Sequence, residues 1–172
     1  MNSLFFKEEH KMIKEMVRDF AITKITPIAR ELDSKELFPK ELVTEMGELG
    51  LMGVMVPEEY GGSGLDMTAF TAAIIELGKA DASVAITMAA HNSLGIMPLL
   101  LFGTEEQKKS YLPDLASGKT LGAFGLTEPD AGSDAGSTKT KAVRSGDEYV
   151  VNGGKICLLY TSDAADEHSC GV

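Results

Sequence analysis

The segment Gly125-Leu126-Thr127-Glu128-Pro129-Asp130-Ala131-Gly132-Ser133-Asp134-Ala135-Gly136 combines hydroxyls, glycines and a proline in one connection. The hydroxyls of Thr127 and Ser133 can hydrogen-bond a ligand's ring edge or diphosphate oxygens without adding charge. Gly132 and Gly136 permit a positive φ and close approach of the backbone to a ligand. Such a loop can cradle a phosphate.

The same residues also fit an ordinary β-turn. Pro129 presets one turn position, and Asp130 and Asp134 can cap neighbouring backbone groups. Residue spacing alone leaves both interpretations open.

On both sides of this segment, hydrophobic residues recur with the spacing expected of β-strands. Leu121–Leu126, Thr138–Arg144 and Glu148–Val151 fit strands, and Ser145-Gly146-Asp147 would join the last two as a hairpin. We therefore expect a domain boundary near Lys119.

Towards the N-terminus, the period is helical. Glu8 to Arg30 predicts an amphipathic helix that Pro27 ends or bends, with a further turn possible over 28–32. Its apolar side is formed by Met12, Ile13, Met16, Val17 and Phe20. A second helix is expected from Pro39 to Gly50, with Leu42, Val43, Met46 and Leu49 facing inward.

The next stretch predicts one extended piece and two capped helices. Leu51 to Glu59 fits a short extended piece followed by a glycine-rich turn. Asp66 is a candidate N-cap for a helix over 67–77 whose buried side holds Phe70, Ala73, Ile74 and Leu77. Thr104 and Gln107 form a capping-box pattern for a helix ending near Ser117-Gly118.

Between these helices, Ala82 to Gly103 contains no Asp, Glu, Lys or Arg. The run is long enough to span a membrane, but Gly95 and Pro98 would weaken its helix. Polar residues also interrupt it, and we expect a buried helix in a bundle. His91 within it fits a hydrogen-bonded core residue better than a ligand contact.

Composition limits the function and the compartment. A net charge of −10 over 172 residues argues against nucleic-acid binding. The two cysteines, Cys157 and Cys170, suggest neither a disulfide framework nor a metal site. Lys139 and Lys141 could meet an anion locally, although solvated strand lysines fit as well. Met1 leads directly into an amphipathic segment, which favours a bacterial-type cytoplasmic protein.

Several motifs in one order resemble the acyl-CoA dehydrogenase family, flavoenzymes that desaturate acyl thioesters. The resemblance runs from about Phe5 to Lys155, and short-chain, butyryl-like members are the most similar. The motifs are Pro57-Glu58-Glu59-Tyr60-Gly61-Gly62, Asn92-Ser93-Leu94-Gly95, Glu105-Glu106-Gln107-Lys108, Tyr111-Leu112-Pro113, the segment 122–134 and Gly146-Asp147-Glu148-Tyr149-Val150-Val151-Asn152-Gly153.

The resemblance implies an α+β fold. Residues 1–118 would form the all-α N-terminal helical bundle domain, and 119–156 the truncated start of a β-barrel-like middle domain that binds FAD and acyl-CoA. The family's C-terminal helical bundle would be missing.

The resemblance also implies a chemistry. In the family, a carboxylate removes the α proton of the acyl-CoA and the β hydride passes to FAD. That base comes from the C-terminal domain, so we assign no catalytic residue here; Glu128 fits a structural role. The implied FAD-binding residues are Phe124, Gly125, Leu126, Thr127, Gly132 and Ser133.

Substrate contacts and partners follow in the same way. Ser133 would lie near the CoA moiety, and Thr87, Ala90 and Leu94 could line the acyl pocket, although core packing explains these three equally well. The implied electron acceptor is an electron-transfer flavoprotein, and the implied full-length assembly is a homotetramer.

Residues 157–172 depart from the pattern. Family members continue with an aromatic residue, isoleucine and a hydroxyl residue, whereas Cys157-Leu158-Leu159 stands here. The stretch from Cys157 to Ser162, followed by Asp163-Ala164-Ala165-Asp166, can be reverse-translated into a sequencing adapter. We therefore interpret 157–172 as a non-native read-through tail; a divergent tail is the alternative.

Other functions stay open at this stage. An acyl-CoA oxidase has related architecture, and a stand-alone helical interaction module would need no catalysis. We expect little dehydrogenase activity from these 172 residues alone, because the base and most of the flavin site would be absent.

Overall fold

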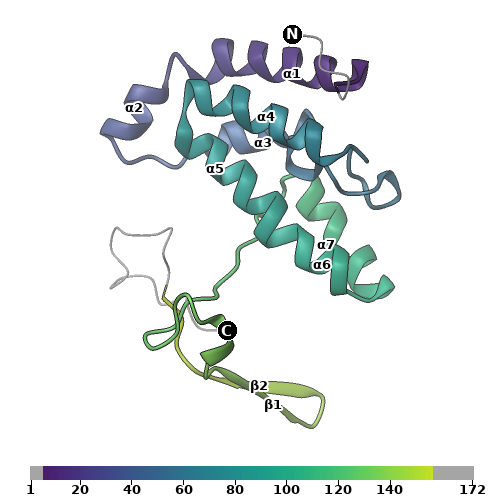
Figure 1. Ribbon diagram of the computed structural model, residues 1–172, viewed down its shortest axis with the longest axis vertical. Helices are drawn as coiled ribbons and strands as arrows, with labels where there is room; N and C mark the ends of the chain where they lie inside the picture. The colour runs from purple at the N-terminus through teal and green to yellow at the C-terminus, as the bar shows by residue number, and fades with distance from the viewer. Residues whose placement is uncertain (1–5, 157–172) are drawn as a thin grey trace. The chain divides into compact units, whose positions relative to one another are not determined.

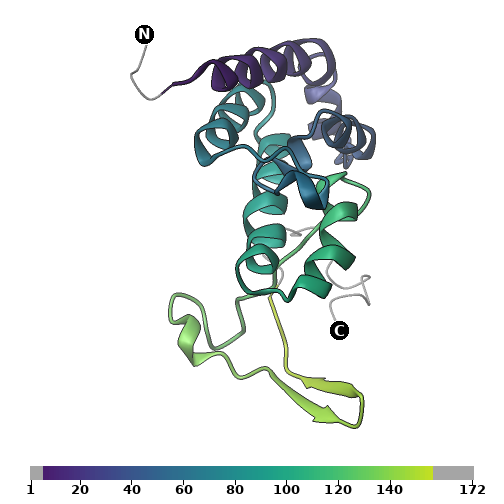
Figure 2. The ribbon, with the colours of Figure 1, turned by 90° about the vertical axis from the view of Figure 1, so that its right-hand side faces the viewer.

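The computed structural model describes residues 6–156, which divide between Ala123 and Phe124 into two compact units, one helical and one with strands (Figures 1 and 2). This mostly helical chain with a small sheet confirms the predicted α+β class. The domain limits 1–118 and 119–156 stay predictions, and the interpretation of 157–172 as a read-through tail concerns residues outside the described range.

The first predicted helix is interrupted before Pro27. It comprises α1 (Glu8–Phe20), a wider π turn η1 (Ala21–Ile25) and α2 (Ala29–Ser34). In η1 the Thr26 amide reaches back five residues to the Ala21 carbonyl, at 2.9 Å. Pro27 has no N–H to continue the helix, so the predicted bend is confirmed.

The prediction that Met12 belongs to the buried apolar face of α1 is wrong. Met12 is 66% exposed, whereas Val17 and Phe20 are buried. The buried stripe begins instead at His10, whose Nε2 lies 3.1 Å from the Asp66 Oδ2 at the start of α4 (Met67–Ala80). Met12 lies two residues after His10, and at about 100° per residue this places it on the opposite side of the helix from His10.

The second predicted helix is confirmed as α3 (Lys40–Glu48), which ends before Gly50 at φ +74°. The extended piece predicted after it is wrong. Two short 3₁₀ turns form there, η2 (Leu51–Gly53) and η3 (Glu58–Tyr60). Gly61 and Gly64 adopt positive φ and return the chain, so that the Gly64 amide donates to the Val56 carbonyl at 2.8 Å.

Four further helical elements follow α4 (Met67–Ala80), namely α5 (Ala82–Ala90), the π turn η4 (His91–Ile96), α6 (Met97–Phe102) and α7 (Glu105–Ala116). Both predicted caps are confirmed. The Asp66 carboxylate accepts from the Thr68 and Ala69 amides, each at 3.0 Å. Thr104 and Gln107 form the reciprocal capping box of α7.

The helical stretch Ala82–Phe102 is long and apolar enough to cross a membrane, a test that core helices also pass, and 33% of its most apolar window is buried in the structure. The expectation of a buried helix holds for one face. Met88 on that face is fully buried, whereas Ile86 and Leu101 are more than half exposed. The absence of a membrane span stays a prediction.

The core of the helical unit lies between α1, α3, α4 and α5 (Figure 1). Val17, Met46, Leu77 and Met88 are fully buried within it. A smaller cluster beneath α7 contains Ile96 and Leu112.

The second unit contains the predicted hairpin. Strands β1 (Lys141–Ser145) and β2 (Glu148–Asn152) pair antiparallel, from Lys141 opposite Asn152 to Ser145 opposite Glu148. Gly146 has a φ of +65° in the two-residue loop, as tight hairpins require. β1 begins three residues later than predicted. The strand predicted at 121–126 is wrong, because nothing in residues 6–156 pairs with it.

Candidate functional site

The candidate site is the loop that precedes β1. Its centre is a β-turn in which the Glu128 amide donates to the Ala131 carbonyl at 2.9 Å and the Ala131 amide donates back at 3.1 Å. Pro129 and Asp130 occupy the two central positions. The β-turn is therefore confirmed, with Pro129 in a central position, whereas the Asp130 and Asp134 carboxylates accept from the Lys139 Nζ and the Ser137 hydroxyl instead of capping the backbone.

The expected role of the glycines needs correction. Neither Gly132 nor Gly136 has a positive φ, and Gly136 lies in the 3₁₀ turn η5 (Ala135–Ser137). Gly132 instead leaves open space, because no heavy atom lies within 4 Å of the position that a Cβ would take. Its contribution is thus an uncovered stretch of backbone beside Ser133.

The Glu128 carboxylate lies beneath the turn and is 6% exposed. It accepts hydrogen bonds from the Lys155 Nζ at 2.8 Å and from the Lys139 and Thr140 amides at 2.6 and 3.1 Å. These donors, Lys155 first, lower the pKa of Glu128 to about 2. The structural role expected for Glu128 is confirmed.

Besides Glu128, the chain that follows β2 bonds two further residues of the loop. The Lys155 Nζ also donates to the Leu126 carbonyl at 3.0 Å, and the Ile156 amide donates to the Thr127 carbonyl at 2.8 Å. Residues 126–128 are therefore held by the chain that follows β2.

The predicted FAD-binding residues lie in this single loop. Thr127 is half-buried, and the other five, Phe124, Gly125, Leu126, Gly132 and Ser133, are exposed. Their binding roles stay predictions.

Two carboxylates of the loop, those of Glu128 and Asp130, are paired locally with lysines. Lys139, considered above as an anion contact, forms an ion pair with Asp130 at 2.9 Å. Glu128 is matched by Lys155. With these charges compensated, the loop offers backbone and hydroxyl donors as its means of meeting an anion.

The predicted acyl-pocket residues lie on α5 and η4. Thr87, Ala90 and Leu94 follow helical spacing and share one face. The Thr87 hydroxyl donates to the Ser83 carbonyl at 2.8 Å, and the Leu94 side chain is 44% exposed. The face they form is partly open, and their contact with substrate stays a prediction.

His91 is a structural residue, as expected. Its Nδ1 accepts from the Gly122 amide at 2.9 Å, so Nε2 carries the proton and donates to the Leu115 carbonyl at 3.0 Å. Burial lowers the pKa of His91 below its ordinary value. Both ring nitrogens are thus used, one in holding α7 and the other in holding the segment after it against η4.

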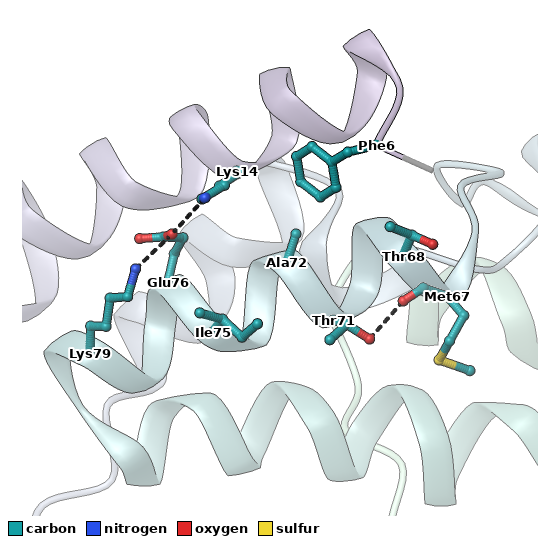
Figure 3. A pocket seen from close by; sticks show the side chains of 9 residues that line it. All are labelled: Phe6, Lys14, Met67, Thr68, Thr71, Ala72, Ile75, Glu76 and Lys79. Atoms are coloured by element: carbon teal, nitrogen blue, oxygen red, sulfur yellow. Dashed lines mark hydrogen bonds and ion pairs between the residues drawn. The ribbon is translucent and has the colours of Figure 1, made fainter. Parts of the chain in front are cut away.

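The structure also contains a groove between α1 and α4 that the sequence did not predict (Figure 3). Its volume is about 330 Å³, and the Glu76 side chain at its edge is 1% exposed. Burial raises the pKa of Glu76, but bonds from Arg18 and Lys79 outweigh this and hold it below the ordinary value. The contact with Lys79 could be expected from the sequence, because Lys79 lies three residues after Glu76 in the same helix. The contact with Arg18 could not, because Arg18 lies 58 residues away.

Comparison with known proteins gives consistent matches. The family model for the acyl-CoA dehydrogenase N-terminal domain matches residues 7–119. A Bacillus subtilis (strain 168) protein named "Probable acyl-CoA dehydrogenase YngJ" is 54% identical over 157 residues, which cover 91% of this chain and 41% of that protein.

Solved structures agree. Butyryl-CoA dehydrogenase from Megasphaera elsdenii is 41% identical with a TM-score of 0.83, over 90% of this chain and 41% of that one. An acyl-CoA dehydrogenase from Bacillus anthracis, complexed with FAD, is 45% identical with a TM-score of 0.81, over 88% of this chain and 26% of that one.

The family match covers well over half of the chain, and the two solved structures align with it at TM-scores of 0.81 and 0.83. The chain spans about 40% of the length of the curated relatives it matches. This chain belongs to the acyl-CoA dehydrogenase family.

Proposed function

We propose that this chain acts as part of an FAD-dependent acyl-CoA dehydrogenase that introduces an α,β double bond into an acyl-CoA thioester. The observation that carries the proposal is the fixed loop 124–133, together with a 45% identical relative that was solved with FAD.

The residues of the loop fit a flavin dinucleotide. Gly132 leaves its backbone uncovered, and Ser133 next to it is exposed, so both can approach diphosphate oxygens. We assign the hydroxyl of the half-buried Thr127 to the polar edge of the flavin ring, as the family resemblance implies. Since Glu128 and Asp130 are each paired with a lysine, they repel an anion less than free carboxylates would.

In the proposed enzyme this loop binds FAD and the CoA portion of the substrate and orients them. FAD, when bound, supplies the acceptor for the hydride that leaves the acyl β carbon. Ser133 holds the CoA portion, and Thr87, Ala90 and Leu94 border the acyl chain. The base that takes the α proton is not among the residues assigned here, and we propose that the rest of a longer polypeptide supplies it.

We further propose a short-chain, butyryl-like substrate, an electron-transfer flavoprotein as electron acceptor, a homotetrameric assembly and a cytoplasmic location. These proposals follow from the family resemblance. Oxygen consumption measured against carrier reduction distinguishes a dehydrogenase from an oxidase.

The test is flavin binding by the product of the complete gene. Thr127→Ala should lower the FAD retained through purification, because the loop loses a hydroxyl donor to the ring. Thr138→Ala, beyond the loop, is the matched control and should retain FAD. Equal flavin content and turnover in both variants and the wild type would contradict the proposal.

A further inference from the structure

Three separated segments meet at one carboxylate in the second unit. Glu128 belongs to the turn, Lys139 and Thr140 precede β1, and Lys155 follows β2. The Glu128 carboxylate contacts donors from the two other segments at 2.6 to 3.1 Å. A single side chain thus fixes where both ends of the hairpin lie relative to the loop.

Apolar packing contributes little here. Between residues 124 and 156, Glu128 and Ala131 are the buried residues, and every residue of β1 and β2 is exposed. Among the described residues, the loop is therefore held mainly by its polar contacts.

The approach of Lys155 requires a glycine. A Cβ on Gly153 would lie 2.7 Å from the Thr140 Cα, closer than such atoms can approach. At Gly154, by contrast, no heavy atom lies within 4 Å of that position. The chain after β2 therefore passes against Thr140 at Gly153, and this close passage leads Lys155 to Glu128.

We propose that Glu128 and Lys155 are positioning residues, whose ion pair holds the backbone of residues 124–133 in the conformation that binds flavin. Neither side chain needs to contact the flavin. This inference rests on the proposed FAD site and adds to it the device that keeps the loop ordered before the cofactor arrives.

Charge and hydrogen bonding support this role. The carboxylate accepts one cationic and two backbone donors, and hydrogen bonds to charged groups are about twice as strong as neutral ones. The charged groups around Glu128 are Lys155 and the exposed pair Asp130–Lys139. The low pKa of Glu128 keeps its carboxylate ionised at neutral pH.

The first experiment measures amide hydrogen exchange in the 172-residue chain without flavin. Glu128→Gln and Lys155→Met should each speed exchange of the amides in 126–131 about tenfold. Asp130→Asn and Lys139→Met remove the exposed pair of the same loop and should leave exchange unchanged. Gly153→Ala should act like the first two variants, and Gly154→Ala like the controls.

The second experiment measures the FAD dissociation constant in the product of the complete gene, by flavin fluorescence. We expect it to rise about tenfold in Lys155→Met and Glu128→Gln and to stay constant in Gly154→Ala, where an added Cβ meets no heavy atom within 4 Å. Unchanged exchange in Lys155→Met and Glu128→Gln overturns the inference, as does faster exchange with unchanged FAD affinity. If Thr127→Ala also leaves FAD affinity unchanged, the proposed FAD site itself fails.

Discussion

At the residue scale, the Asn92 side chain forms three buried hydrogen bonds to the backbone. Its Nδ2 donates to the Leu51 and Met88 carbonyls at 2.9 and 3.0 Å, and its Oδ1 accepts from the Val54 amide at 3.1 Å. The residue is 1% exposed. Asn92 therefore ties η4 to η2 and satisfies backbone groups that have lost access to water.

Replacing Asn92 should show what these bonds contribute. Asn92→Leu keeps the number and branching of the side-chain heavy atoms but leaves the Val54 amide and the Leu51 carbonyl without this partner, so we expect the free energy of unfolding to fall by about 3 kcal/mol. Urea unfolding measures this. The control is Ser93→Ala, whose exposed hydroxyl bonds its own helix, and which should change stability by less than about 0.5 kcal/mol. Equal stability of the two variants would contradict the assigned role.

His91 should make stability depend on pH. Its folded-state pKa lies below the ordinary 6.5, so the unfolded chain binds more protons once the pH falls below 6.5. The contribution of His91 is complete above that value and is lost as the pH falls through the folded-state pKa. We expect the urea midpoint to fall between pH 7.5 and pH 5, and to fall less in His91→Asn. An equal fall in both proteins would rule out His91 as the source.

At the element scale, the π turn η4 lies where two backbones touch. A Cβ on Gly95 would lie 2.6 Å from the Gly122 Cα, and the same Gly122 donates its amide to His91. Gly95 therefore lets the segment after α7 cross the helix in direct backbone contact.

Gly95→Ala should destabilise the helical unit by about 1–3 kcal/mol, because the colliding atoms are backbone and cannot rotate away. Gly78→Ala is the matched control within α4, where the new Cβ would meet the Ala85 Cβ at an ordinary 3.7 Å. Helix propensity should then raise stability by about 0.5–1 kcal/mol. Thermal unfolding followed by circular dichroism measures both changes in stability. Stability changes of the same sign in the two variants would contradict the close contact proposed at Gly95.

The elements that could be predicted are those with local causes. The caps at Asp66 and Thr104 and the hairpin around Gly146 depend on residues a few positions apart. The segment 121–126 had a strand-like pattern, but a strand also needs a partner, and the pattern cannot supply one. The 3₁₀ turns after Gly50 were missed because contacts between residues ten apart fold them back, as between Gly53 and Ser63.

At the scale of the whole molecule, the candidate loop was recognisable and its anchoring was not. Motifs located residues 124–133, and the position of Glu128 beside Pro129 suggested a structural role. No local pattern could show that Lys155, 27 residues later, would complete its contacts. The expected positive φ at Gly132 was wrong because the turn is closed by Pro129 and Asp130 instead.

The most direct test of the account is hydrogen exchange in the product of the complete gene, measured with and without FAD. We predict that FAD slows exchange of the amides in 124–133 and leaves those of α1 unchanged. If FAD binds while exchange at 124–133 stays the same, this loop does not hold the cofactor and the account is wrong.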